Sequence, residues 1–300
     1  MHEDAGKRGK ENSMNTNKGK RKGIPVGGRR ALAYLVLILM SFLCLVWFFI
    51  LFINATKSKG ELTRGFTAIP STHLMENLRD GVLRGTLPFI RGMLNSMFVA
   101  GCSALLCTYF STMTAYAIHV YDFRLKKFMS TFILAVMMIP TQVTALGFLQ
   151  LVGKMKLENN FIPLIVPSIA APVTYFYMKQ YMESTLPLSL IEAARIDGSG
   201  EFHTFNIIVL PLMKPAIAVQ AIFTFVTSWN NYFTPALVLH KDTMKTLPIL
   251  IAQLRSADFL KFNMGHVYAA VGFSIFPVIL VYLFLSRYIV GGTTLGGVKG

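Results

Sequence analysis

The chain has 300 residues, of which 53% are hydrophobic and 14% are charged, and its formal net charge is +15. Soluble domains carry about 25% charged residues, so this composition excludes an ordinary soluble domain and predicts a membrane protein with several spans. The basic charge does not indicate nucleic-acid binding, because the basic segment 1–30 holds no aromatic residue that could stack on bases.

The first 30 residues form a basic leader, with nine Lys and Arg against three Asp and Glu. We expect a disordered cytoplasmic tail that fixes orientation and touches anionic lipid. The apolar run 31–53 follows at once. It exceeds the roughly 7–15 residues of a signal-peptide core and is long enough to cross a membrane of about 30 Å as a helix.

Five further apolar runs follow the first, and together they predict an all-α membrane protein with six transmembrane helices. Each run is long and nearly free of charge, which is the main signal of a spanning helix. The expected domain covers 31–290, and a Gly-rich tail covers 291–300. The six predicted spans are 31–53, 92–118, 128–152, 161–179, 207–232 and 267–287.

The placement of Lys and Arg sets the expected orientation. The leader and the short loop 119–127, with Arg124, Lys126 and Lys127, are basic, and basic segments favour the cytoplasmic side. An even number of spans then puts both termini in the cytoplasm. The same orientation places the connection 180–206 there, in a multi-pass protein of the cell membrane.

The sequence contains no motif that could supply energy for transport. The middles of the six predicted spans contain no Asp, Glu, His or Arg of the kind that couples ions to transport. The chain has no phosphate-binding G-x-x-x-x-G-K-[ST] loop and no H-E-x-x-H pair. Its three cysteines form no metal-binding spacing. We therefore expect a non-catalytic subunit without cofactor or metal, driven by a separate partner.

We expect that partner to act on the segment 188–211, which reads LSLIEAARIDGSGEFHTFNIIVLP. Ser189 and Glu192 have the spacing of a capping box, which predicts a helix over 190–196. Gly198 is placed to end it in a left-handed conformation. From these residues alone two interpretations stay open, a helix that docks a partner and an amphipathic helix that lies on the membrane.

This segment resembles the EAA signature of the membrane-spanning subunits of ABC importers. The matching residues are Glu192, Ala193, Ala194, Asp197, Gly198, Leu210 and Pro211. The resemblance implies a cytoplasmic coupling helix between spans four and five, seated in a cleft of an ATP-binding-cassette ATPase subunit. It also implies a second homologous permease subunit and an extracellular solute-binding protein as partners.

The Asp-Gly form of the motif resembles the carbohydrate branch of the family, in particular its maltose-type inner-membrane subunit. The stretches MLNSMFVAG at 93–101, TSWNNYFTPALVL at 227–239 and the ending RYIVGGTTLGGVKG agree with this. The resemblance implies a sugar or oligosaccharide as the transported solute. A non-sugar solute, such as a peptide or a polyamine, is the alternative.

Polar side chains inside the predicted spans are candidates for the solute path or its gate. Asn95, Asn230 and Asn231 could donate hydrogen bonds to a hydroxylated solute, and Trp229 could stack on a sugar face. Hydrogen bonding between helices is the alternative role for such residues. The prolines in the spans likewise fit either hinges or static bends.

Overall fold

The computed structural model describes residues 26–85, 87–256 and 263–296. The chain divides into two compact units, Met1–Phe49 and Ile50–Gly300. In the first unit the described residues belong to helix α1 (Val26–Ala55), which continues into the second. Its apolar part, Arg30–Ala55, has the length and composition of a membrane span.

The helices at both ends of the chain extend past the predicted domain boundaries. Helix α1 begins at Val26, so residues 26–30 of the predicted tail are helical, and residues 1–25 lie outside the described part. Helix α16 (Phe276–Gly296) likewise runs through most of the predicted C-terminal tail. Residues 297–300 of that tail lie outside the described part.

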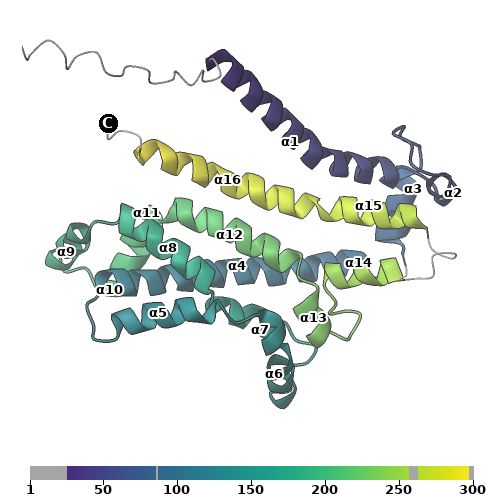
Figure 1. Ribbon diagram of the computed structural model, residues 1–300. Helices are drawn as coiled ribbons and strands as arrows, with labels where there is room; N and C mark the ends of the chain where they lie inside the picture. The colour runs from purple at the N-terminus through teal and green to yellow at the C-terminus, as the bar shows by residue number, and fades with distance from the viewer. Residues whose placement is uncertain (1–25, 86, 257–262, 297–300) are drawn as a thin grey trace, which may run out of the picture. The chain divides into compact units, whose positions relative to one another are not determined.

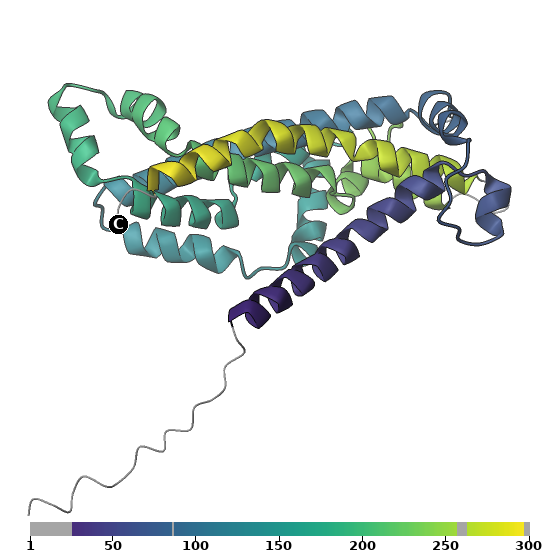
Figure 2. The same ribbon diagram turned by 90° about the horizontal axis from the view of Figure 1, so that it is seen from above.

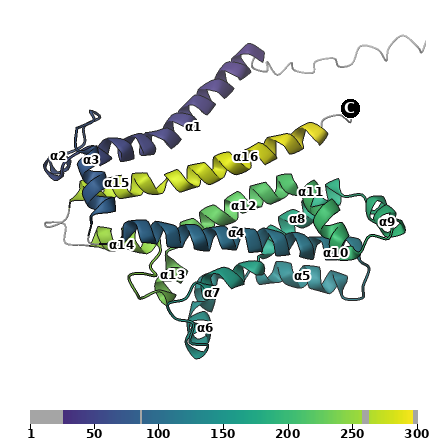
Figure 3. The same ribbon diagram turned by 180° about the vertical axis from the view of Figure 1, so that it is seen from behind.

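Helix α4 (Phe89–Val120) is the central element of the second unit, with 32 residues and no break. It packs mainly against α12 (Lys214–Trp229) and α8 (Pro172–Thr185), and α12 also packs against α16 (Figures 1 and 3). At 1.5 Å per residue α4 is about 48 Å long, enough to cross a membrane with some tilt.

Within the described residues, three helical segments are long and apolar enough to span a membrane. They are Arg30–Ala55, Phe89–Val120 and Met264–Ile289, and a bent pair, Glu201–Leu212 with Lys214–Trp229, makes a fourth if it is counted as one span. The all-helical membrane fold therefore agrees with the prediction, but only the predicted spans 31–53, 92–118 and 267–287 fall on such long apolar segments.

The predicted third and fourth spans are each broken into shorter helices. The run 128–152 folds as α5 (Lys126–Val136) and α6 (Thr141–Lys154). The run 161–179 folds as α7 (Ile162–Ile165), the 3₁₀ turn η2 (Val166–Ile169) and α8. Pro140, Pro167 and Pro172 stand at these breaks. Proline removes a backbone donor and disfavours helix at the residue before it.

The predicted fifth span, 207–232, is not one continuous helix. The segment α10 (Glu201–His203), the π-helical turn η3 (Thr204–Val209) and α11 (Leu210–Leu212) meets α12 at an angle of 80°. Pro211 and Pro215 flank this bend. The sixth span has a milder break at Ile275, between α15 (Met264–Ser274) and α16.

The longer connections are folded. The connection 54–91 contains α2 (Lys59–Thr63), α3 (Leu74–Leu78) and the π-helical turn η1 (Arg79–Leu83). The buried Asn77 side chain holds it together by donating to the backbone oxygens of Ala55 and Lys57, each at 2.9 Å. The connection 233–266 contains α13 (Phe233–Val238) and α14 (Leu247–Ser256).

The two ends of the α4–α12–α8 bundle carry different connections. Helix α9 (Leu188–Ile196) lies with α10 and α11 at one end, whereas α14 and the start of α15 lie at the other (Figures 1 and 3). From above, the green segment that contains α9 projects beyond the end of the bundle (Figure 2). The fold therefore presents α9 as a terminal protrusion.

Candidate functional site

Helix α9 begins one residue before the predicted capping box. Pro187 occupies the N-cap position with φ −69° and ψ 136°, and Leu188 is the first helical residue. Ser189 therefore lies inside the first turn, where its side chain cannot act as the cap. The predicted capping box of Ser189 and Glu192 is wrong. The N-cap is Pro187, which has an extended backbone, and no side chain caps the helix.

The end of α9 matches the prediction. Gly198 has φ +79°, in the left-handed region. Its amide donates to the Arg195 oxygen at 3.0 Å, and the Ser199 amide donates to the Ala194 oxygen at 2.9 Å. These two bonds satisfy the last carbonyls of the helix in the pattern of a Schellman motif. The left-handed residue of this motif is usually glycine, because the absence of a Cβ removes the steric cost of a positive φ.

The residues of the EAA pattern lie on two faces of α9. Ile191 is 1% exposed and Ala194 is 6% exposed, so this face is turned into the protein. Glu192, Ala193 and Asp197 are exposed. Since a helix turns 100° per residue, the two adjacent alanines point in different directions. Ala194 packs against the bundle, whereas Ala193 keeps the side-chain bulk on the outer face of α9 small.

Ile196 is a feature that the sequence reasoning missed. It stands in the last turn of α9 and is 86% exposed. Leu188 and Leu190 on the same helix are also exposed. The exposed Ile196 side chain stands between two charged residues, Arg195 and Asp197. The helical spacing of Ile191 and Ala194 indicates the buried face, which leaves Ile196 outside.

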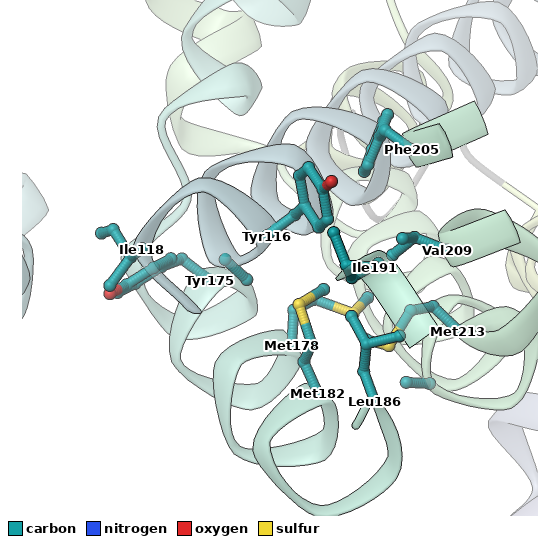
Figure 4. Close-up of a cluster of buried hydrophobic side chains, with 12 residues drawn as sticks. Tyr116, Ile118, Tyr175, Met178, Met182, Leu186, Ile191, Phe205, Val209 and Met213 are labelled. Atoms are coloured by element: carbon teal, nitrogen blue, oxygen red, sulfur yellow. The ribbon is translucent and has the colours of Figure 1, made fainter. Parts of the chain in front are cut away.

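The buried face of α9 rests on a dense apolar cluster. Ile191 lies among Tyr116 of α4, Met178 and Met182 of α8, and side chains of the segment that follows α9 (Figure 4). The complete set of buried members is Ala115, Tyr116, Ile118, Tyr175, Met178, Met182, Leu186, Ile191, Phe205, Val209, Met213 and Ala216. Leu210 packs against this cluster, whereas Pro211 is exposed at the bend before α12. Because the cluster contains side chains from several helices, a displacement of α9 would act on all of them.

A cavity of about 540 Å³ lies beside the middle of α4. Its wall comes from α4, α6, α7, α8, α12 and α13, and from the residues between them. The polar members of the wall are Ser103, Cys107, Thr144, Ser168, Thr174, Gln220, Thr224, Thr227, Ser228, Asn231 and Thr234. Among the described residues that line it, none is an Asp, Glu, Lys or Arg. The cavity thus offers hydroxyl, thiol and amide groups but no charge.

Cys107 joins three helices at the wall of this cavity. Its sulfur lies 3.3 Å from the Thr174 hydroxyl of α8 and 3.5 Å from the Thr224 hydroxyl of α12. Ser103 stands one turn earlier on α4. The spacing of small polar residues four apart on one helix face is the sequence signal that could have identified this wall.

The four predicted path residues do not all line one cavity. Asn231 is in the wall of the cavity beside α4, whereas Trp229 and Asn230 line a second cavity of about 320 Å³. Trp229 is buried and stacks on Phe225, with ring centroids 5.7 Å apart. Asn230, the residue after α12, donates to the backbone oxygen of Val226 in that helix at 2.9 Å.

Asn95 holds the loop before α14. Its amide nitrogen donates to the backbone oxygens of Thr243 at 3.1 Å and Lys245 at 2.9 Å. Gln220, an amide inside a predicted span, lies in the cavity wall instead. Position along the chain alone could not separate these amides, because the wall is assembled from distant segments.

Comparison with known proteins identifies the family. Residues 108–294 match the family described as binding-protein-dependent transport system inner membrane component. The chain is 38% identical over 206 residues to the arabinooligosaccharides transport system permease protein AraQ of Halalkalibacterium halodurans, covering 69% of this chain and 73% of that protein. It is 33% identical over 272 residues to AraQ of Bacillus subtilis, covering 89% and 94%.

A solved structure shares the fold. A bacterial ABC transporter involved in the import of the acidic polysaccharide alginate contains a chain with a TM-score of 0.75 and 21% identity, covering 89% of this chain and 99% of that one. The family match covers more than half of the present chain and includes α9, the bend and most of the cavity wall. The protein belongs to the inner-membrane components of binding-protein-dependent transport systems, the non-catalytic permease subunits of ABC importers.

Proposed function

We propose that this permease subunit carries an uncharged saccharide, with an oligosaccharide of the kind named for its AraQ relatives as the first candidate. The observation that carries the proposal is the cavity beside α4, whose described lining holds hydroxyl and amide groups without a charged side chain. Energy comes from a separate ATP-binding-cassette subunit that docks on the exposed face of α9.

The chemistry of the cavity favours a neutral solute. A carboxylate, phosphate or ammonium group that leaves water at membrane depth is costly unless an opposite charge receives it. Sugar hydroxyls need only hydrogen-bond partners, which Thr227, Ser228 and Gln220 provide. Phe148 and Phe223 add apolar rings to the same wall. A volume of about 540 Å³ falls in the usual range for small-molecule sites, roughly 300–1,000 Å³.

The outer face of α9 supports the docking part of the proposal. Ala193 and Ile196 form an apolar strip, and Glu192 and Asp197 stand beside it. An apolar anchor surrounded by polar groups is the usual form of a protein contact that dominates binding energy. The partner set is completed by a second homologous permease and an extracellular solute-binding protein.

The proposed topology keeps six crossings and both termini in the cytoplasm. The pairs α5 with α6 and α7 with α8 then act as broken spans, and the bent segment before α12 brings α9 to the cytoplasmic side. Broken helices are tolerated at membrane depth where they line a cavity, and the wall beside α4 includes residues of α6, α7 and α8. The basic residues Arg124, Lys126 and Lys127 stay in the cytoplasm.

Topology is tested with single cysteines in a variant that lacks the three native ones. Ile69→Cys and Arg124→Cys are labelled in intact cells with a membrane-impermeant maleimide. The proposal predicts labelling at position 69 and protection at position 124 until the membrane is opened. The reverse pattern would contradict the orientation and would remove α9 from reach of a cytoplasmic ATPase.

The solute is tested on the complete transporter, purified with its binding protein and reconstituted in liposomes that contain ATP. Uptake of arabinotriose is compared with uptake of an alginate trisaccharide and of spermidine. The proposal predicts uptake of the neutral sugar only. Uptake of the uronate or of the polyamine, at a rate equal to or above that of the sugar, would overturn it and favour a charged or non-sugar cargo.

A further inference from the structure

The carboxylate of Glu201 receives three donors from three parts of the chain. Arg195 in the last turn of α9 donates from Nε to Oε1 at 2.7 Å. The hydroxyls of Tyr116 in α4 and of Tyr121 just after it donate to Oε2 at 3.1 and 2.5 Å. Glu201 itself opens the segment that leads to α12. One side chain thus joins α9, α4 and the approach to α12.

Further contacts reinforce this group, which we call the Glu201 cluster: Tyr116, Tyr121, Arg195 and Glu201. The Arg195 guanidinium lies over the Tyr121 ring, 5.6 Å from its centroid. Burial and the hydrogen bond to Glu201 raise the pKa of the Tyr121 hydroxyl, so it remains a donor. The Tyr116 ring lies 5.5 Å from the Phe205 ring inside the apolar cluster beneath α9. Polar and apolar contacts therefore converge at the same end of α4.

Helix α4 connects this cluster to the cavity without a break. Tyr116 and Cys107 are nine residues apart on it, which corresponds to about 14 Å along the axis. Cys107 stands in the cavity wall and contacts α8 and α12. A displacement applied at Tyr116 moves the wall at Cys107, because a continuous helix transmits it as a rigid rod.

We propose that Glu201 is the positioning residue that passes the displacement of α9 to α4 and so to the cavity wall. This inference rests on the proposed function, in which an ATPase moves α9. Apolar packing at Ile191 resists separation but is non-directional. Hydrogen bonds from Arg195 and the two tyrosines fix the register between α9 and α4. Ligand binding and ATPase docking belong to other residues.

The partial exposure of the cluster shapes its expected phenotype. The Arg195 and Glu201 side chains are 40% and 44% exposed, and an exposed ion pair contributes little to stability. Loss of Glu201 also removes the acceptor of the buried Tyr116 hydroxyl, which lowers the stability of the folded protein. We expect the protein still to fold and assemble, and coupling to be reduced. Glu183, paired with Lys179 on α8 at 3.1 Å, is a matched control because it is another partly exposed glutamate in an ion pair.

The first experiment compares Glu201→Ala with Glu183→Ala in the reconstituted transporter with its binding protein. We expect both variants to co-purify with the ATPase. Stimulation of ATP hydrolysis by the binding protein should fall about fivefold or more in Glu201→Ala and remain unchanged in Glu183→Ala. Tyr121→Phe should have a smaller effect, and none in addition when Glu201 is already Ala. Full stimulation in Glu201→Ala would overturn the inference.

The second experiment follows the cavity wall directly. In a Cys44→Ser/Cys102→Ser background, the remaining Cys107 is labelled with methyl methanethiosulfonate, with and without trapping by ATP and vanadate. We expect trapping to change the labelling rate, and we expect that change to disappear in Glu201→Ala but not in Glu183→Ala. An unchanged response in Glu201→Ala, or no response without any substitution at Glu201, would refute the transmission route.

The outcomes separate the inference from the proposed function. If the ATPase fails to co-purify with the chain that carries native Glu201, the docking proposal fails. If it co-purifies and drives transport equally well with or without the Glu201 carboxylate, only the inference fails.

Discussion

Two parts of helix α4 differ in how closely they are packed. Around Tyr116 the helix is surrounded by closely packed side chains, and its polar groups have partners in the Glu201 cluster. Around Ser103 and Ser111 it borders open space, and within the described part of the chain both serine hydroxyls are buried without a hydrogen-bond partner. Packed regions transmit movement, whereas an incompletely satisfied region is prepared to change its contacts.

The difference follows from the neighbours of α4. The Tyr116 part packs beneath α9, with Met178, Met182 and Phe205 filling the space. The Ser103 part faces α7, η2 and α12, where prolines shorten the helices and leave about 540 Å³ unfilled. We therefore propose that one part of the helix transmits force and the other contacts the solute.

The largest effect is expected at Ile191. Ile191→Ala removes a side chain that is 1% exposed and should lower the free energy of unfolding by about 2–5 kcal/mol. Thermal unfolding of the purified protein in detergent measures this loss. A change below about 0.5 kcal/mol, the usual range for surface positions, would mean that α9 is not packed against the bundle.

Ile196→Ala is the matched control on the same helix. The side chain is 86% exposed, so stability should change by less than about 0.5 kcal/mol. Affinity for the purified ATPase should instead fall by about 1–2 kcal/mol, roughly tenfold or more in Kd. A stability loss equal to that of Ile191→Ala would show that both faces of α9 are internal.

Gly198→Val should have the next largest effect. An added Cβ at Gly198 meets nothing within 4 Å, so its cost comes from the left-handed backbone at φ +79° and should be about 1–2 kcal/mol or more. Uptake into proteoliposomes should fall at normal expression. Gly200→Val is the control, because Gly200 also has free space and lies at φ −69°. Equal uptake in both variants contradicts a role for the Gly198 cap.

A moderate effect is expected at the opposite end of the bundle from α9. Asn95→Ala removes two hydrogen bonds that hold the backbone at Thr243 and Lys245, and should cost about 1 kcal/mol of stability. Thermal unfolding measures this change. Asn230→Ala is the comparison, because it removes a hydrogen bond to the nearby Val226 backbone and none to a distant segment. If stability is unchanged and uptake is lost, the role of Asn95 would instead be in the solute path.

The smallest effect on stability is expected at Ser103. Its hydroxyl has no partner in the described part of the chain, so Ser103→Ala should be nearly neutral or slightly stabilising. If the solute or another transport state uses this hydroxyl, the apparent affinity for arabinotriose should fall while stability stays the same. A destabilisation above about 1 kcal/mol would show that Ser103 already has a structural partner.

The sequence predicted the α9 region better than the cavity. The EAA pattern and Gly198 are local signals, because a left-handed residue and a helix end depend on neighbouring residues. The buried and exposed faces of α9 could be inferred in part from the spacing of Ile191 and Ala194. The capping box predicted at Ser189 was wrong, because Pro187 occupies the N-cap position and the helix starts at Leu188.

The cavity and the breaks depend on residues far apart in the chain. Hydropathy is high across 128–152 and 161–179, so length alone predicted continuous spans. The prolines fitted static bends or hinges, with bends favoured. Trp229 and Asn230 were assigned to the path by their chemistry. In the fold Trp229 stacks on Phe225 and Asn230 donates to the backbone of Val226, and both line a cavity other than the one beside α4. Their assignment to the path stays a prediction, and the partners of each side chain, which only the fold provides, could not be read from the sequence.

The central claim, that α9 is the contact for an ATPase, is tested most directly by site-specific crosslinking in the membrane. A benzoylphenylalanine is placed at position 196 on α9, or at the exposed position 69 in the connection 54–91, and illuminated in the assembled transporter. The account predicts a covalent adduct with the ATP-binding subunit from position 196 and none from position 69. An adduct from position 69, or an intact complex without an adduct from position 196, would contradict it.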